Sequence, residues 1–516
     1  MSRDVVVIGS GHNGLVAAAL LGKSGRNVLV LEANDKLGGM CAGYEFGEGY
    51  LVPGILQDTS TFRRWIFDGL GLESHGLRFR QQGIPILVPA EDGSRVVVLR
   101  NSGHLGAGFE PEVSVDVEAY IDWRGFIDRV APVILQQLDS IPPELNPSGS
   151  AQAWDLFKRG VTIRRLGKKD LVELARVLPM SAADWLEDCF QSELLRSALS
   201  LPAVFGSFYG PRGAGTAANL LVHECTAGTE VEGGAAGLVR ALVSACNSAG
   251  VELRTDAAVK EIRVGSGEVR GVTLASGEEI DSPLVVASCD PKQTFLGLLP
   301  RGILPLRFEE QIRSIRTRGV TAIVHLGLSG HIDFECCQGE QFEAVRICES
   351  DMIEIERAFD AVKYGRCAER PVLDIRIPTL SQPALAPEGH QVVSIQVQGV
   401  PYSLEGGWTS EKREQLGDVV IRLLGECAPA LEGLVACREV LTPVDLEKKF
   451  GLSGGHLCHG EHALDQLFSM RPIPACAQFS TPVGGLFLAG SGSHPGGGIT
   501  GVPGALAARV VLAGES

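Results

Sequence analysis

Residues 5–40 read VVVIGSGHNGLVAAALLGKSGRNVLVLEANDKLGGM, and this stretch decides the fold. Its first four residues are all β-branched, which favours a strand buried on both faces of a parallel sheet. A glycine-rich loop follows at once, and the Ala/Leu-rich segment 15–21 predicts a helix. A second apolar strand over 28–31 then delivers Glu32. Strand, glycine loop, helix, strand and acid stand in the order of a nucleotide-binding βαβ unit.

The loop is a GxGxxG motif, and each of its glycines meets a physical requirement. Gly9 allows a tight turn, Gly11 lets the backbone approach a pyrophosphate, and Gly14 lets the helix pack on the strand. The start of the helix offers free N–H groups and a positive dipole end to the phosphates. Glu32, 18 residues after Gly14, is placed to accept a hydrogen bond from a ribose hydroxyl. The stretch therefore predicts a dinucleotide site, with a glycine-rich turn of another α/β fold as the alternative.

The residues after Glu32 distinguish between dinucleotides. A short polar turn leads to the pair Gly38-Gly39, which lets the backbone pass close to a ligand where a side chain would collide. An acid followed by such a turn and pair is more typical of FAD-binding oxidoreductases than of NAD dehydrogenases. The sequence predicts FAD.

Composition limits the class of protein. The chain has 516 residues, 45% hydrophobic and 21% charged, which is typical of a globular protein with two domains. A net charge of −16 argues against nucleic acid as the main partner. Thirteen cysteines without framework spacing fit reduced thiols. No apolar run reaches the roughly 18 residues of a membrane span, and a strand at residue 5 leaves no room for a signal peptide. We expect a cytoplasmic protein, with contact to a membrane surface still open.

The remainder of the chain alternates between two kinds of pattern. Short strands, including a hairpin over 84–99, precede a long helical region from about 113 to 201 that is interrupted at Pro142-Pro143. Residues 228–298 return to a helix and short apolar strands. Alternating strands over 320–400 predict a half-exposed antiparallel sheet. At the end, a short strand over 485–489, the loop GSGSHPGGG over 490–498 and an Ala-rich helix over 502–512 predict a second contact with the same cofactor.

With these motifs assembled, the chain resembles the phytoene-dehydrogenase-like flavoproteins, which include the bacterial carotenoid desaturases. The resemblance runs nearly end to end, and it is strongest in the branch named for a pyridine nucleotide-disulphide oxidoreductase domain. It rests on GSGHNGLVAA over 9–18, Gly233-Gly234, Arg471-Pro472 and, most specifically, GSGSHPGGG over 490–498. The family implies an α/β fold with a glutathione-reductase-like Rossmann FAD-binding domain in discontinuous pieces. It also implies non-covalent FAD and an inserted substrate domain of mixed antiparallel sheet and helices.

The resemblance divides the chain and places the site residues. The FAD-binding pieces are expected at 1–100, 228–298 and 426–516, with a helical insertion at 101–227 and the antiparallel sheet of the substrate domain at 299–425. His494 is the candidate for a direct role in the redox step; alternatively, it fixes the glycine loop. The residues expected to contact FAD are Gly9, Gly11, Gly14, Glu32, Ala33, Gly38, Gly39, Met40, Val259, Gly490, Ser491, Gly498 and Ile499.

Two other chemistries find weaker support. Disulphide reductases place a CxxxxC pair after the first Gly-Gly, but Phe46 stands where a thiol resolving Cys41 would be needed. The segment GGHLCHGEH over 454–462 has histidines at a spacing of three, but its glycines argue against a regular helix that would align them as metal ligands. We therefore expect neither thiol catalysis nor a metal site, and the histidines of 454–462 are expected to line the flavin or substrate pocket instead.

The basic run from Lys158 to Lys169 stands out in an acidic chain. It is either a solvated helix face or a patch that contacts an anionic membrane beside a substrate entrance.

The leading interpretation is an FAD-dependent dehydrogenase or desaturase of a small apolar substrate, polyene- or isoprenoid-like, that passes hydride to flavin N5. Oxygen or a quinone would reoxidise the flavin, because no second strand–GxGxxG–helix unit is present for NAD(P). The alternatives are an amine oxidase, a redox-neutral flavin isomerase or cyclase, and a flavin-stabilised interaction protein with little turnover.

Overall fold

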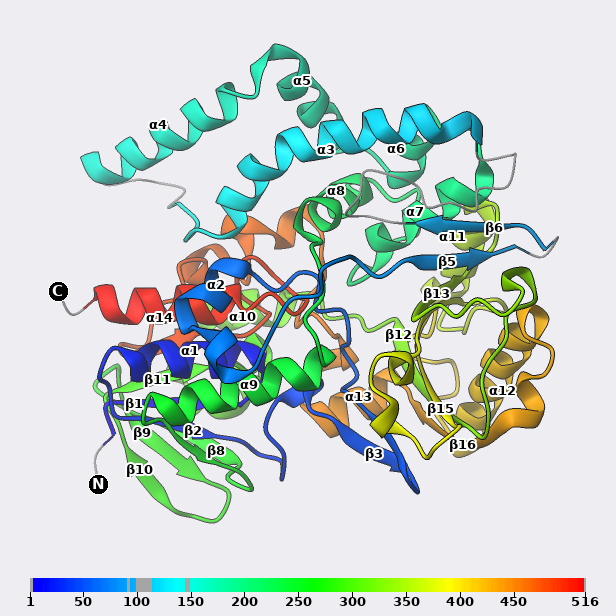
Figure 1. The fold of residues 1–516 in the computed structure, drawn as a ribbon. Helices are drawn as coiled ribbons and strands as arrows, with labels where there is room; N and C mark the ends of the chain where they lie inside the picture. The colour runs from blue at the N-terminus through cyan, green and yellow to red at the C-terminus, as the bar shows by residue number, and fades with distance from the viewer. Residues whose placement is uncertain (1–2, 91–92, 99–113, 144–148, 515–516) are drawn as a thin grey trace.

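The computed structural model describes residues 3–90, 93–98, 114–143 and 149–514. Two large sheets organise these residues, and a group of helices covers the second sheet (Figure 1). The first sheet is parallel and has five strands, in the order β17 (Leu486–Leu488), β11 (Leu284–Ala287), β1 (Val5–Ile8), β2 (Val28–Leu31) and β7 (Glu252–Arg254).

The parallel sheet forms the middle of three layers. Val5 and Val7 of β1 pack against helices on one face, whereas Val6 and Ile8 pack against the opposite core. This explains the unbroken apolar run, and the prediction of a strand buried on both faces is confirmed. The helices are α1 (His12–Lys23), α2 (Arg64–Leu70), α9 (Gly234–Ser248) and α14 (Val502–Ala513). The opposite layer contains α10 (Leu306–Ser314) and a small antiparallel sheet of β8 (Val259–Gly265), β9 (Glu268–Leu274) and β10 (Glu279–Asp281).

The second sheet has seven strands and is mainly antiparallel. Its order is β16 (Val435–Leu441), β12 (Thr321–Leu328), β15 (Gln391–Gln398), β14 (Val372–Arg376), β13 (Ala344–Ile347), β5 (Ile86–Pro89) and β6 (Arg95–Val98). The expectation of a half-exposed sheet is wrong for its centre, because all eight residues of β12 are buried. One face packs on α12 (Ser410–Cys427), and part of the other lines a cavity described below.

Two segments that the expected boundaries assign to the FAD-binding domain belong instead to the seven-stranded sheet. The β5–β6 hairpin falls within 1–100 and β16 falls within 426–516, yet both join the seven-stranded sheet. The hairpin has apolar residues on both faces and needs two cores to cover them. Ile86 and Val88 pack against the helical group, whereas Leu87 packs on the α12 side. Part of the predicted turn, residues 91–92, lies outside the described residues.

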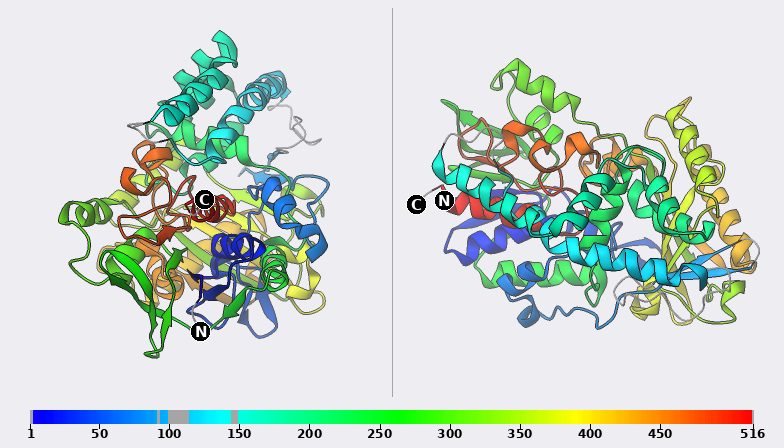
Figure 2. Two further views of the ribbon diagram at one scale, coloured as in Figure 1. Left: turned by 90° about the vertical axis from the view of Figure 1, so that its left-hand side faces the viewer. Right: turned by 90° about the horizontal axis from the view of Figure 1, so that it is seen from above.

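The helical region extends to residue 226 and lies against the β5–β6 hairpin (Figures 1 and 2). Its helices are α3 (Val117–Leu138), α4 (Ser150–Arg164), α5 (Gly167–Val177), α6 (Ala182–Cys189), α7 (Glu193–Val204) and α8 (Thr216–Thr226). Helix α4 lies at the outer edge of this group. Four further elements lie between and beside the sheets: β3 (Tyr44–Gly47), β4 (Tyr50–Val52), α11 (Met352–Lys363) and α13 (Pro443–Phe450). No described helix is long and apolar enough to cross a bilayer.

Candidate cofactor and substrate sites

The geometry of the glycine loop between β1 and α1 explains each of its three glycines. Gly9 has a φ of +89°, in the region that side chains disfavour. A Cβ at Gly14 would lie 2.2 Å from the carbonyl oxygen of Gly9, so only glycine allows α1 to pack this closely. A Cβ at Gly11, by contrast, would meet no atom within 4 Å. Gly11 therefore faces open space, where a ligand can approach the backbone.

That open space is a cavity of about 390 Å³, which we call the dinucleotide cavity. It lies at the carboxyl ends of β1 and β2, where open α/β sheets bind their ligands. The structure brings together eight of the predicted cofactor residues along its walls: Gly9, Gly11, Glu32, Ala33, Gly39, Met40, Val259 and Ser491.

The carboxylate of Glu32 is buried and fixed at the end of β2. One oxygen accepts hydrogen bonds from the amide of Ser10, at 2.9 Å, and from its hydroxyl, at 2.6 Å. The other accepts from the amide of Asn34 at 3.0 Å. The carboxylate is thus oriented toward the glycine loop, and the oxygen that accepts from Asn34 keeps a second lone pair for a ribose hydroxyl.

Three buried polar atoms beside the glycine loop lack a hydrogen-bond partner within the described chain: Nε2 of His12, Oδ1 of Asn13 and Nδ1 of His459. All three residues line the dinucleotide cavity. Burial, with the nearby His459, lowers the pKa of His12 to about 4, so its imidazole is neutral at pH 7. Since buried polar atoms are normally satisfied, these atoms fit a ligand with donors and acceptors, as FAD is. Sequence reasoning missed His12 and Asn13, although both stand inside the motif itself, whereas the segment that contains His459 is expected from the sequence to line the flavin or substrate pocket.

The remaining predicted cofactor residues lie elsewhere. The amide of Gly38 donates to the Ser10 carbonyl at 3.1 Å, which closes the loop. A Cβ at Gly490 would lie 2.4 Å from the Ser288 carbonyl oxygen, so this glycine permits close packing. Gly498 and Ile499 line a second cavity of about 220 Å³. We call it the inner cavity.

The inner cavity lies between the C-terminal glycine loop, the ends of α3 and α7, α8 and the seven-stranded sheet. Part of its wall is apolar: Leu56, Leu138, Pro202, Phe205, Val222, Val320, Leu457, Leu467, Phe468 and Ile499. The sheet contributes a polar floor: Thr321, Arg346, Asp374, Gln396 and Gln398. His223 also lines this cavity, whereas its neighbour Glu224 accepts from Arg124 at 2.6 Å in a buried ion pair.

Two further imidazoles line the inner cavity, but neither offers a lone pair to it. Nδ1 of His456 accepts from the backbone amide of Cys458 at 3.2 Å, and Nε2 of His462 accepts from that of Gly497 at 3.1 Å. Burial lowers the pKa of His456 to about 3 and that of His462 well below 6.5. Each ring is neutral, and its second nitrogen carries a proton. These rings can donate hydrogen bonds but do not act as bases.

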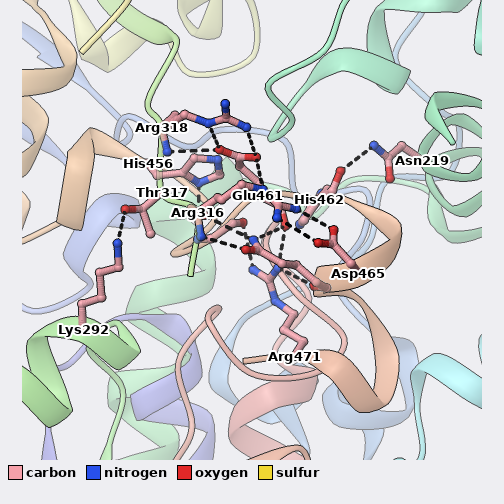
Figure 3. Close-up of polar contacts among 12 residues, drawn as sticks. Asn219, Lys292, Arg316, Thr317, Arg318, His456, Glu461, His462, Asp465 and Arg471 are labelled. Carbon is pink, nitrogen blue, oxygen red and sulfur yellow. Dashed lines mark hydrogen bonds and ion pairs between the residues drawn. The ribbon is translucent and has the colours of Figure 1, made fainter. Parts of the chain in front are cut away.

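Buried charged groups hold the segment 456–471 in place (Figure 3). Glu461 accepts from Arg316 at 3.1 Å and from Arg318 at 2.7 and 2.9 Å. Arg471 donates only to carbonyl oxygens, among them those of Ser491 at 2.8 Å and Cys458 at 2.6 Å. Burial lowers its pKa to about 10, and no carboxylate in the described part of the chain pairs with it. Arg471 thereby fastens the C-terminal glycine loop to the wall of the inner cavity.

His494 lines neither cavity. Its Nε2 lies 3.2 Å from the backbone oxygen of Gln137 at the end of α3, and its ring packs against Phe468. Burial lowers its pKa to about 4. This position favours the alternative in which His494 fixes the glycine loop over direct participation in the redox step.

The structure also separates the residues of the two other candidate chemistries. His456 and His462 accept from different backbone amides, Nδ1 of His459 has no partner in the described chain, and the described residues contain no group of three or more side chains able to hold a metal ion. Burial raises the pKa of Cys41 to about 12, so its thiol stays protonated. The sulfurs of Cys336 and Cys337 lie 3.7 Å apart and are not bonded.

Comparisons with known proteins agree with this geometry. The family model described as "Flavin containing amine oxidoreductase" matches residues 14–509. The chain is 32% identical to the rat pyridine nucleotide-disulfide oxidoreductase domain-containing protein 2, over 99% of this chain and 93% of the rat protein. It is 26% identical to a limonene dehydrogenase component of Castellaniella defragrans, over 98% and 94%. It is 25% identical to the phytoene desaturase of Fusarium fujikuroi, over 99% and 89%.

Among solved structures, cyclohexylamine oxidase from Brevibacterium oxydans superposes with a TM-score of 0.58, covering 100% of this chain and 98% of the oxidase. At 17% identity, that likeness concerns the fold alone. The expected resemblance to the desaturase-like flavoproteins, the glutathione-reductase-like fold and the cofactor are confirmed. The chain therefore belongs to the family of flavin-containing amine oxidoreductases and is an FAD-dependent oxidoreductase.

Proposed function

We propose that this protein is a dehydrogenase whose substrate has an apolar body and binds in the inner cavity. FAD would be held in the dinucleotide cavity by the glycine loop, Glu32, His12 and Asn13. When bound, it supplies a two-electron acceptor for a hydride. The observation that carries the proposal is the apolar part of the inner cavity's wall, beside Gly498 and Ile499 of the C-terminal glycine loop. That wall packs against the apolar body of the substrate and orients it toward the loop.

In this proposal the chain binds and orients the substrate but does not supply a catalytic base. Dehydrogenation of a C–C bond removes one hydride and one proton. Because the lone pairs of His456 and His462 already accept backbone N–H groups, these rings do not take the proton. We propose that water accepts it, and that the two electrons pass on to oxygen or a quinone.

The relatives support a terpenoid substrate, since two are named for limonene and phytoene. The volume of the inner cavity favours a small terpenoid such as limonene over a long one such as phytoene. Pockets for organic ligands measure roughly 300–1,000 Å³, and about 220 Å³ encloses a small molecule or one end of a long one. A complete long polyene would extend outside.

An amine oxidase is the second candidate, and two carboxylates in the inner cavity favour it. Asp374 and Asp58 both line the cavity. Burial opposes the ionisation of Asp58, but Arg376, His223 and the hydrogen bond from the backbone amide of Ser60 together hold its pKa below the usual range. Two carboxylates could bind an ammonium group, although Arg346 and Arg376 already oppose their charge.

The test is anaerobic reduction of the FAD-loaded enzyme. Mixing it with a monoterpene, a carotenoid or a primary alkylamine should bleach the flavin band only with a true substrate. Bleaching by a terpenoid, with a product two mass units lighter, supports the dehydrogenase. Bleaching by the amine alone would replace it with the amine oxidase.

We also propose that α4 contacts an anionic membrane surface. Trp154 and Phe157 are 57% and 59% exposed, and their rings stack 5.2 Å apart. Lys158, Arg164, Arg165, Lys168 and Lys169 are exposed nearby. Arg159 differs, because it donates to Gln137, Ser140 and Ile141 and so ties α4 to the end of α3, next to Leu138 of the inner cavity. A surface patch of this kind would bring the enzyme to substrates dissolved in a bilayer.

Co-sedimentation with liposomes tests this contact. Binding should require anionic lipid, weaken at high salt, and fall when Trp154 and Phe157 are both replaced by serine. Equal, negligible sedimentation with neutral and anionic vesicles would leave the basic run as a solvated helix face.

A further inference from the structure

The polar floor of the inner cavity is a continuous row across three strands. Arg346 of β13 lies opposite Asp374 of β14, and Asp374 lies opposite Gln396 of β15. All three side chains line the cavity, together with Gln398 two residues further along β15. Alternation along β15 places Val393, Ile395 and Val397 in the core on the other face. The sheet thus turns an apolar face to α12 and a hydrogen-bonding face to the bound molecule.

Arg346 has more donors in this row than the protein uses. Its residue is only 4% exposed, and its Nε donates to Asp374 at 2.8 Å. Within the described chain, the two terminal nitrogens of the guanidinium have no hydrogen-bond partner. A buried arginine normally spends its five N–H donors on acceptors. The terminal N–H groups of Arg346 are therefore available to donate hydrogen bonds to an oxygen of a bound molecule.

Both glutamines can add to this donor set. The side-chain oxygen of Gln398 already accepts from the hydroxyl of Thr321 at 3.0 Å, which leaves its NH₂ group to donate. The side-chain amide of Gln396 has no hydrogen-bond partner among the described side chains, so its NH₂ group can donate to a molecule in the cavity. Because Asp374 balances the charge of Arg346, the floor offers donors without a large net charge. A hydrocarbon would leave all of them unsatisfied, at a cost in binding.

We infer that the substrate carries an oxygen acceptor, a carbonyl or a carboxylate, that binds to Arg346, Gln396 and Gln398 while its apolar body lies along the wall beside Ile499. This inference rests on the proposed function, which it deepens from an apolar to an amphipathic substrate. It assigns specificity to residues of the sheet, remote in sequence from both glycine motifs. The hydrogen removed would then come from the carbon chain between the acceptor and the apolar end.

The test measures binding of matched eight-carbon probes to the FAD-loaded enzyme by anaerobic difference absorbance of the flavin and by calorimetry. Octanoate and 2-octanone carry an acceptor, 1-octene carries no polar group, and octylamine carries a cation. We expect octanoate or 2-octanone to bind roughly ten-fold or more tightly than 1-octene, the effect of one charge-assisted hydrogen bond. Which of the two is preferred distinguishes a carboxylate from a carbonyl.

Variants locate the effect. Gln396→Leu and the double variant Arg346→Gln/Asp374→Asn should each reduce the preference for the acceptor probe. The double variant removes both charges of the pair together, so it leaves no unpaired charge buried. Ser394→Ala, on the same face of β15 but outside the cavity wall, should keep the wild-type preference.

Equal binding of all probes, tightest binding of 1-octene or octylamine, or an unchanged preference in both variants overturns the inference. The dehydrogenase proposal is judged separately, by flavin bleaching. A hydrocarbon that bleaches the flavin and binds more tightly than the acceptor probes would leave the dehydrogenase standing and refute the acceptor.

Discussion

Replacing Gly11 by valine should remove FAD while leaving the protein folded. Gly11 has φ −56° and ψ 163°, a conformation open to any residue, and an added Cβ meets no protein atom within 4 Å. The cost to the apoprotein is the loss of a glycine from the N-cap of α1, about 1 kcal/mol. That lowers Tm by at most about 2–4 °C.

The cost to FAD binding is much larger. The new side chain projects into the dinucleotide cavity, where the pyrophosphate must approach the backbone. Displacing it from two N–H groups forfeits about 1.5–3 kcal/mol for each hydrogen bond to a charged group. The sum of about 3–6 kcal/mol corresponds to a rise in Kd of roughly 100-fold to 20,000-fold. Flavin fluorescence titration of apoprotein and differential scanning fluorimetry measure the two effects separately.

Matched variants make the comparison decisive. Gly14→Ala places a Cβ 2.2 Å from the Gly9 oxygen, so it should lower the Tm of the apoprotein itself. Gly160→Ala lies in α4, meets nothing within 4 Å and should retain both FAD and Tm. A Gly11→Val protein that purifies with a full complement of FAD, or that unfolds as readily as Gly14→Ala, would refute the reasoning.

Three further outcomes follow from buried groups. Cys41→Ser should keep its FAD and its turnover because the thiol is protonated, with burial raising its pKa to about 12; loss of turnover with FAD retained would restore a thiol mechanism. Glu32→Ala should weaken FAD binding by roughly ten-fold or more, through the lost acceptor for ribose and the freed donors of Ser10; an unchanged Kd in the fluorescence titration would contradict the site. His325→Phe should raise Tm, because both ring nitrogens are buried without a partner in the described structure between Tyr44 and Phe46. Burial, with Lys449, lowers the pKa of His325 to about 3. Stability tied to this neutral ring is present above about pH 6.5 and lost as pH falls toward 3, so Tm of the variant should fall less steeply between pH 7 and pH 5.

The FAD-binding half could be predicted from sequence because its determinants are local. A β-branched run, three glycines and an acid specify the turn, the close packing and the ligand contact within about 30 residues, and Val5–Ile8, Gly9 and Glu32 lie as expected. The two later pieces of the parallel sheet follow the same pattern of short apolar strands.

The inner cavity could not be predicted, because its residues come together only through long-range packing. Arg346, Asp374 and Gln396 read as ordinary polar positions of alternating strands, and nothing in a strand's own sequence tells whether its polar face meets water or a cavity. His494 stood out for its place in a specific motif, but the end of α3 covers it. The three orphaned atoms of His12, Asn13 and His459 are visible only once the cavity walls are known.

The strands of the parallel sheet are synthesised at widely separated times. β1 and the glycine loop are synthesised well before β17, the Ser491 loop and α14, which complete that sheet, cover α1 and lie within residues 486–513. At about 5–20 residues per second, the two halves of the FAD site are separated by roughly 25–95 s of synthesis. Until then, the edge of β11 and the face of α1 lack the elements that cover them in the folded protein. A stop codon before residue 486 would therefore remove both β17 and the second glycine loop and abolish assembly of the FAD site.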